Sequence, residues 1–268
     1  ELPNWYLPYA SKFIYSGYRP INDDIGECIA SLFKWHNELV NVWSHLVPGC
    51  VFAVVLFETL LVNGVSSVDD VLFLFLLTSV MYAYLSSAGF HCVMCHSENV
   101  AKYAVRCDMI GIIMHLVGMC AYILHSMLHC HHETLRNAFI RIGVYFVVLV
   151  FICTRKEFTD KKYKTFKPVP FIIMGILLMQ PMVSWARDDA IGPLDDKADV
   201  VAWCITSWVL LATAVLFYVA RFPERWFPGQ FDLLGSSHNW FHFFVVISST
   251  SALVAASRVR QHDWCTLE

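Results

Sequence analysis

The chain has 268 residues, of which 57% are hydrophobic and only 15% are charged, and its mean hydropathy is +0.53. This balance excludes an ordinary soluble domain, in which charged residues are more frequent. The net charge is only -3 and no basic tract is interleaved with aromatic residues, which argues against a nucleic-acid partner.

An N-terminal segment, residues 1–38, is rich in aromatic residues and is predicted to be cytosolic and to lie at the membrane interface. Seven apolar blocks follow, each near the ~20 residues that a helix needs to cross a bilayer. Because the blocks are continuously apolar, they indicate helices rather than the alternating strands of a β-barrel. The predicted spans cover residues 39–63, 71–95, 105–129, 137–154, 170–187, 200–221 and 237–257. The sequence thus predicts an all-α membrane protein, a seven-helix transmembrane bundle over 39–257 with a tail at 258–268.

Lysines and arginines divide unevenly between the two faces of this bundle. The face that holds the N-terminal segment and the connections between spans 2–3, 4–5 and 6–7 carries 13 of them, against 6 on the other face. Six of the 13 lie in the 4–5 connection, from Arg155 to Lys167. Because cytosolic loops carry the excess, the N-terminus is predicted to be cytosolic and the C-terminus external or lumenal.

Polar residues inside spans are costly and usually face the bundle interior, so each is a candidate for function. At the start of the first span, Glu38, Asn41 and His45 share one helix face. Two interpretations have equal weight. The residues form either a second layer around a functional site or a polar start to the helix.

Span 2 ends in the run SSAGFH, which puts Ser87 and His91 four residues apart on one helix face. Asp108 stands near the start of span 3, and His238 and His242 are again four apart at the start of span 7. The alternation of spans places all five residues at the cytosolic face. Three neutral imidazoles that leave a fourth position to water are typical of catalytic zinc sites. We therefore predict zinc as a cofactor held by the three histidines.

The predicted zinc site gives the two other residues a chemical use. Asp108 could orient or deprotonate a water molecule whose pKa zinc lowers to about 7, and Ser87 could hydrogen-bond the water or an oxyanion. The alternative is that the histidines only cap helices or pair with neighbours. The residues by themselves leave both interpretations open.

Span 3 ends in a second and denser group of histidines, HSMLHCHHE, which begins at His125 and includes His129 and His132. By topology this group lies at the opposite, external face, at a helix C-terminus where the helix dipole favours protonated histidine. We interpret it as structural or pH-sensitive rather than as a metal site.

Four blocks, HNELVNVWSHL, SSAGFHCVMCHSE, the aspartate of RCDMIG, and RFPERWFPGQFDLLGSSHNWFH, resemble the progestin and adiponectin receptor (PAQR) family. The resemblance extends from residue 17 to residue 257. It implies seven helices, a cytosolic N-terminus and an intramembrane zinc. It assigns the zinc ligands to His91, His238 and His242, a water-linked aspartate to Asp108 and a serine to Ser87. Asn239 departs from the family's SHQxxH pattern, at a position that is not a proposed ligand.

The resemblance implies two classes of function. In the first, the chain is a receptor-type membrane protein that hydrolyses the amide of a ceramide-like lipid, because alkaline ceramidases carry a similar set of Ser, His and Asp residues. In the second, it is a non-catalytic receptor or scaffold with structural zinc, for example one that tethers a signalling kinase at the Golgi. The expected partners are membrane lipids, including ceramide or fatty acid, and a protein ligand or cytosolic signalling partner. The expected location is the plasma membrane or the Golgi.

Overall fold

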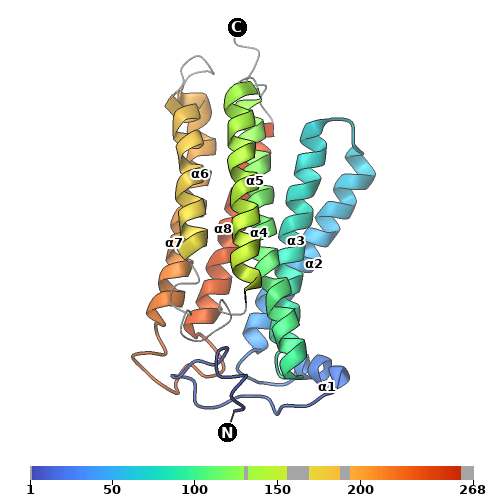
Figure 1. Cartoon of the computed structure of the whole chain (residues 1–268), viewed down its shortest axis with the longest axis vertical. Helices are drawn as coiled ribbons and strands as arrows, with labels where there is room; N and C mark the ends of the chain where they lie inside the picture. Colours follow the sequence, from blue (N-terminus) through green and yellow to red (C-terminus); the bar gives the residue numbers. More distant parts are fainter. Residues whose placement is uncertain (1, 130–131, 156–168, 188–193, 261–268) are drawn as a thin grey trace.

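The computed structural model describes residues 2–129, 132–155, 169–187 and 194–260. Within these residues the fold is entirely helical, which confirms the predicted all-α class. Figure 1 shows long helices standing side by side, with the N-terminal segment and a short helix gathered across one end. We call this the N-terminal end of the bundle and the other the distal end. The lysine-rich stretch 156–167 and the residues from 261 onward lie outside the described residues.

Eight α-helices and one short 3-10 helix make up the described fold. They are α1 (Ile25–Ala30), the 3-10 helix (Ser31–Phe33), α2 (Leu39–Asn63), α3 (Val68–Val93), α4 (Glu98–Leu128), α5 (His132–Thr154), α6 (Val169–Arg187), α7 (Leu194–Ala220) and α8 (Ser237–Arg260). Six of them, α2, α3, α4, α5, α7 and α8, are long and apolar enough to cross a membrane. Helix α6 matches the fifth predicted block but is not among the six, so the count of seven spans stays a prediction.

The helices differ in how much of their surface is covered. Helix α3 packs against α2 and α4, and α7 packs against α8. Of the six candidate spans, α3, α4 and α8 are the most buried, whereas α2 and α5 are the least buried. The exposed side chains of α2, such as Val54, Phe57 and Leu61, are apolar, as a lipid-facing surface requires. The central helices are therefore those in which polar side chains can be shielded from lipid.

Small residues bring α3 and α4 close together. A Cβ atom added at Gly111 on α4 would lie 2.8 Å from the Cα atom of Ala83 and 2.6 Å from the Ser86 hydroxyl oxygen on α3. Backbone atoms cannot give way as a flexible side chain can, so Gly111 sets the separation of the two helices. This contact lies one turn of α4 from Asp108.

The N-terminal segment packs inward as well as lying across the bundle end. Tyr6 is 1% exposed and makes edge contacts with the rings of Tyr9 and Tyr18. It belongs to a buried cluster that includes Phe90 near the end of α3. Only part of the segment, such as the 68% exposed Tyr15, remains available to a membrane interface. The segment therefore covers the helix ends that carry the predicted site.

Candidate metal centre

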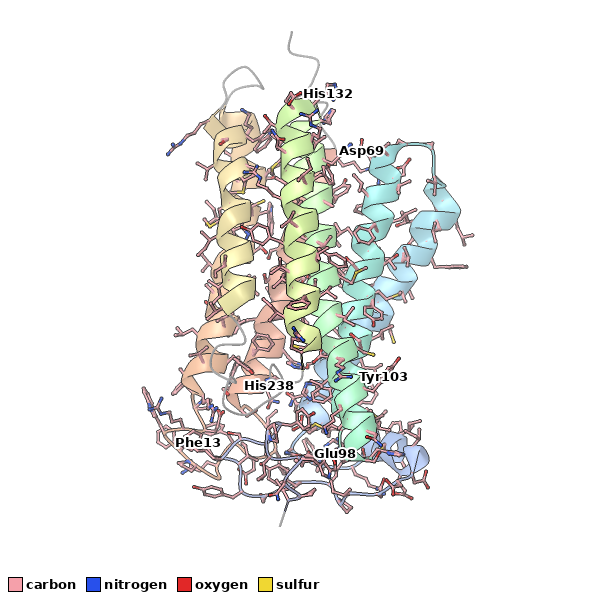
Figure 2. All side chains as sticks on the ribbon, in the orientation of Figure 1. Phe13, Asp69, Glu98, Tyr103, His132 and His238 are labelled. Atoms are coloured by element: carbon pink, nitrogen blue, oxygen red, sulfur yellow. The ribbon has the colours of Figure 1, made fainter. Side chains whose placement is uncertain are left out.

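Three histidines from two helices meet at the N-terminal end of the bundle. His91 lies in the last turn of α3, and His238 and His242 lie in the first two turns of α8. One ligand nitrogen from each lies within 4.8 Å of the others, a spacing that could hold a metal ion. The Nε2 atoms of His91 and His238 are 3.3 Å apart. Figure 2 shows His238 in the lower part of the bundle, at about the height of Tyr103 in α4 and above Glu98, where that helix begins.

The start of α8 is fixed by a buried carboxylate. Glu224, 2% exposed, accepts hydrogen bonds from both the backbone N–H and the hydroxyl of Ser237, the first residue of the helix. A carboxylate at a helix N-terminus satisfies free N–H groups and complements the helix dipole. The helix thus begins at a defined residue, and His238 and His242, one turn apart, point to the same side.

Helix α2 and Glu38, the residue that precedes it, contribute none of the three nitrogens but hydrogen-bond two of the rings. Glu38 Oε2 lies 2.8 Å from His91 Nδ1. The Ser44 hydroxyl donates to the Asn41 carbonyl oxygen at 3.1 Å, so it can only accept from His242 Nδ1, 3.0 Å away. Both contacts require the proton on Nδ1, which leaves the Nε2 lone pairs of the two histidines free to bind a metal.

The second layer extends across to α8 through two amides. Asn41 Nδ2 donates to Glu38 Oε2 at 2.7 Å, and Asn239 Nδ2 donates to Asn41 Oδ1 at 2.7 Å. Burial by itself would raise the pKa of Glu38, but the hydrogen bonds from His91 and Asn41 outweigh it and lower the pKa to about 2. Glu38 is therefore an anion at neutral pH. The polar start of α2 thus contacts His91 and His242, and its role as a second layer around a metal stays a prediction.

Ser87 on α3 and Asp108 on α4 are buried at the same end of the bundle as the histidines. They are 5% and 7% exposed, and the Asp108 carboxyl on α4 interacts electrostatically with His91 at the end of α3. Ser87 Oγ also lies 2.9 Å from Nδ1 of His45. The His45 ring in turn stacks on His242 with 3.8 Å between centroids. Their catalytic roles stay predictions.

Three residues around the site were not singled out by the sequence. Ser44 and Asn239 were seen in the motifs but given no role, although each hydrogen-bonds a residue of the site. Tyr218 on α7 packs on His238 with 5.9 Å between ring centroids. A polar residue within an HxxxH spacing was a usable signal for Asn239, whereas a single tyrosine inside an apolar block gives none.

The group of histidines at the end of span 3 lies at the distal end of the bundle. His125 Nδ1 is 2.9 Å from a carboxylate oxygen of Asp69, and its ring stacks on His129 with 6.0 Å between centroids. Figure 2 shows Asp69 and His132 together at that end, far from His238. Within the described parts of the chain, only His91, His238 and His242 have metal-binding spacing. The structural or pH-sensitive role of the distal group stays a prediction.

The sequence of this chain is similar to those of several known membrane receptors. Residues 33–253 match the haemolysin-III related family. A progestin and adipoQ receptor-like protein of Caenorhabditis elegans is 27% identical over 93% of this chain and 57% of its own length. An ADIPOR-like receptor of Saccharomyces cerevisiae is 30% identical over 93% of this chain and 79% of its own length. The human membrane progestin receptor alpha is 29% identical over 95% of this chain and 74% of its own length. The chain thus spans a little over half of the nematode relative.

Proposed function

Because this chain belongs to the haemolysin-III related family, which includes progestin and adipoQ receptors, we propose that it is a receptor-type zinc protein that hydrolyses a lipid amide. Six apolar helices and this membership make it an integral, multi-pass membrane protein. The finer statements below, on topology, metal, reaction and partners, are all part of the proposal.

The proposed topology has seven spans, with α6 as one of them. The N-terminal end of the bundle, with its metal centre, faces the cytosol, and the distal end faces the exterior or the lumen. The excess of 13 over 6 lysines and arginines supports this orientation. The proposed location is the plasma membrane or the Golgi.

The three histidines fit zinc by their chemistry. They offer imidazole nitrogens, a donor type that zinc prefers, and carboxylate and hydroxyl acceptors hold the Nδ1 protons of His91 and His242. Zinc, when bound, would supply Lewis-acid activation of water.

The chain's own residues account for the remaining steps. The Asp108 carboxylate would take the proton of the attacking water, and the Ser87 hydroxyl would donate a hydrogen bond to the amide carbonyl oxygen as negative charge develops there. Asp108 would then pass the proton to the departing amine. The proposed substrate is a ceramide-like lipid that enters from the bilayer, and the products are a fatty acid and an amine.

The observation that carries this proposal is the position of Asp108 and Ser87. Structural zinc sites are closed by four protein ligands, whereas catalytic sites keep three and leave one position open. Within the described residues the group has three histidines, and the carboxyl and hydroxyl beside them are buried inside an apolar bundle. Burying a carboxyl in a membrane protein is costly and usually marks a functional site.

The test compares zinc content and lipid amide hydrolysis in the full chain purified in detergent. Asp108→Asn preserves the size of the side chain but removes its base, so we expect zinc to be retained and hydrolysis of a fluorescent short-chain ceramide to fall at least 100-fold. Asp69→Asn, a matched change at the distal end, should leave the hydrolysis rate unchanged.

The opposite outcome would favour a receptor or scaffold with structural zinc. In that case the wild-type chain binds zinc and turns over no lipid amide, while His91→Ala lowers the melting temperature. A protein ligand or a cytosolic signalling partner would then carry the function.

A further inference from the structure

The N-terminal segment crosses the end of the bundle between the two helices that carry the histidines. We call residues 13–22 the strap. At one end it is bonded to the segment that leads into α8. Asp232 accepts hydrogen bonds from the backbone N–H groups of Tyr15 and Ser16, at 3.2 and 2.7 Å, and from the Ser16 hydroxyl at 2.7 Å. The Phe13 carbonyl oxygen accepts from the Gly229 N–H at 3.0 Å.

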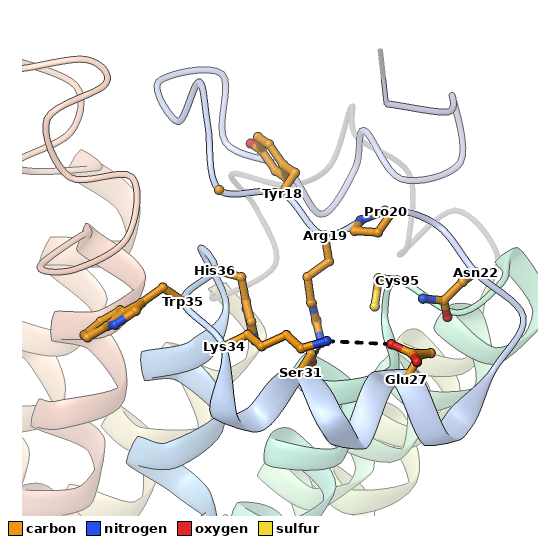
Figure 3. Close-up of a pocket in the computed structure, with 11 residues that line it drawn as sticks. Tyr18, Arg19, Pro20, Asn22, Glu27, Ser31, Lys34, Trp35, His36 and Cys95 are labelled. Carbon is orange, nitrogen blue, oxygen red and sulfur yellow. Dashed lines mark hydrogen bonds and ion pairs between the residues drawn. The ribbon is translucent and has the colours of Figure 1, made fainter.

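The other end of the strap is bonded to α3 through one side chain. Arg19 donates to the backbone carbonyl oxygens of His91 at 2.6 Å and of Cys92 at 2.7 Å. A third bond, at 2.9 Å, goes to the Ser31 hydroxyl after α1. The arginine is 8% exposed. Figure 3 shows it reaching from the strap to Ser31 across a cavity of about 230 Å³.

The hydrogen bonds from Arg19 hold the last turn of α3, which carries His91. The last carbonyl groups of a helix have no partner within the helix, and a positive charge there is favourable. The planar guanidinium binds two of them at once, which an ammonium group cannot do with the same geometry. Because one of these carbonyls belongs to His91 itself, Arg19 fixes the backbone from which the ring projects.

We propose that the strap holds the end of α3 and the start of α8 at the separation the metal requires, and that Arg19 is a positioning residue for His91. A ligand set drawn from two helices keeps its spacing only if the helix ends are tied together. The strap makes that tie through Asp232 on one side and Arg19 on the other. This inference rests on the metal centre of the proposed function.

The experiment measures metal affinity in the full chain by competition with a zinc chelator. Arg19→Met keeps the length of the side chain and removes its donors. We expect the zinc dissociation constant to rise between 10- and 100-fold, the usual effect of losing a group that orients a ligand. Arg19→Lys should recover part of the loss. Lys34→Met is the matched control, because the Lys34 side chain is exposed and forms its ion pair with Glu27, at 3.9 Å, rather than with α3.

A second measurement uses metal-free protein. Hydrogen exchange at residues 90–95, the end of α3, should become faster in Arg19→Met and stay unchanged in Lys34→Met. If Arg19→Met only lowers the melting temperature, with zinc affinity and exchange equal to those of Lys34→Met, the positioning role is wrong. If the wild-type chain binds no zinc, the proposed function fails, and the exchange rates still decide whether Arg19 fixes this helix end.

Discussion

Replacing Glu38 by glutamine tests most directly whether this residue forms a second layer around the candidate metal centre. The carboxylate accepts hydrogen bonds from His91 Nδ1 at 2.8 Å and from Asn41 at 2.7 Å, and its pKa of about 2 keeps it charged at pH 7. Glutamine preserves the shape and one acceptor oxygen but removes the charge. The variant therefore isolates the electrostatic part of the contact.

The expected effect follows from the two kinds of hydrogen bond. A bond to a charged group contributes about 1.5–3 kcal/mol and a neutral one about 0.5–1.5 kcal/mol. Glu38→Gln should thus weaken zinc binding by about 1–1.5 kcal/mol, close to tenfold in the dissociation constant. Glu38→Ala removes the acceptor as well, and we expect a loss nearer 100-fold.

Zinc affinity would be measured by competition with a chromogenic chelator in detergent. Glu98→Gln provides the control, because Glu98 lies at the same end of the bundle but is exposed and pairs with Lys102. Equal affinities for Glu38→Gln and Glu98→Gln would refute the idea that α2 orients His91. An equal loss of zinc affinity in both variants would mean that the net charge at this end of the bundle, rather than the contact with His91, controls zinc binding.

Two further predictions concern the bundle itself. Gly111→Ala should destabilise the protein by about 1–3 kcal/mol, because the new methyl group meets the backbone of Ala83, whereas Gly143→Ala, with nothing within 4 Å, should be neutral or slightly stabilising. Thermal unfolding compares the two, and equal melting temperatures would contradict the close α3–α4 contact. Burial lowers the pKa of His36 to about 4, so the unfolded chain binds more protons below pH 6.5 and stability is lost as the pH falls from 6.5 towards 4. His36→Asn should flatten the pH dependence of the melting temperature in this range, and parallel curves for variant and wild type would count against it.

The apolar blocks predicted the helices well but not all of their ends. The first block, 39–63, matches α2 (Leu39–Asn63), whereas the third began at residue 105 and α4 begins at Glu98. A hydropathy window measures the length that can sit in lipid. The first turns of α4 carry Glu98, Lys102 and Arg106, so the helix continues beyond its apolar part into a polar environment.

The candidate site could be predicted only in part, namely where residue spacing and the alternation of the spans determine which side chains meet. Two residues four apart share a helix face, and alternating spans bring distant faces to one end, so the meeting of His91 with His238 and His242 followed from spacing and topology. The bonds from Arg19 to backbone carbonyls did not, because every residue has a carbonyl and no pattern marks the one to be used. The role of Asp232 could not be predicted for the same reason, because it accepts hydrogen bonds from backbone N–H groups, which nearly every residue has.

The contacts in the candidate metal centre join residues that are far apart in the sequence, and this separation sets the order in which the contacts can form during biosynthesis. His91 and His238 are 147 residues apart, whereas Glu38, which directly precedes α2, and His91 in the next long helix are 53 apart. The α2–α3 hairpin can therefore pair its polar side chains soon after both helices enter the bilayer, at the point where an unpaired histidine or carboxylate would be most costly. Helix α8 then adds its two imidazoles to a surface that is already arranged. During biosynthesis α2 would thus shield the polar end of α3 from lipid, and the group of three histidines would be complete only after α8 has been inserted.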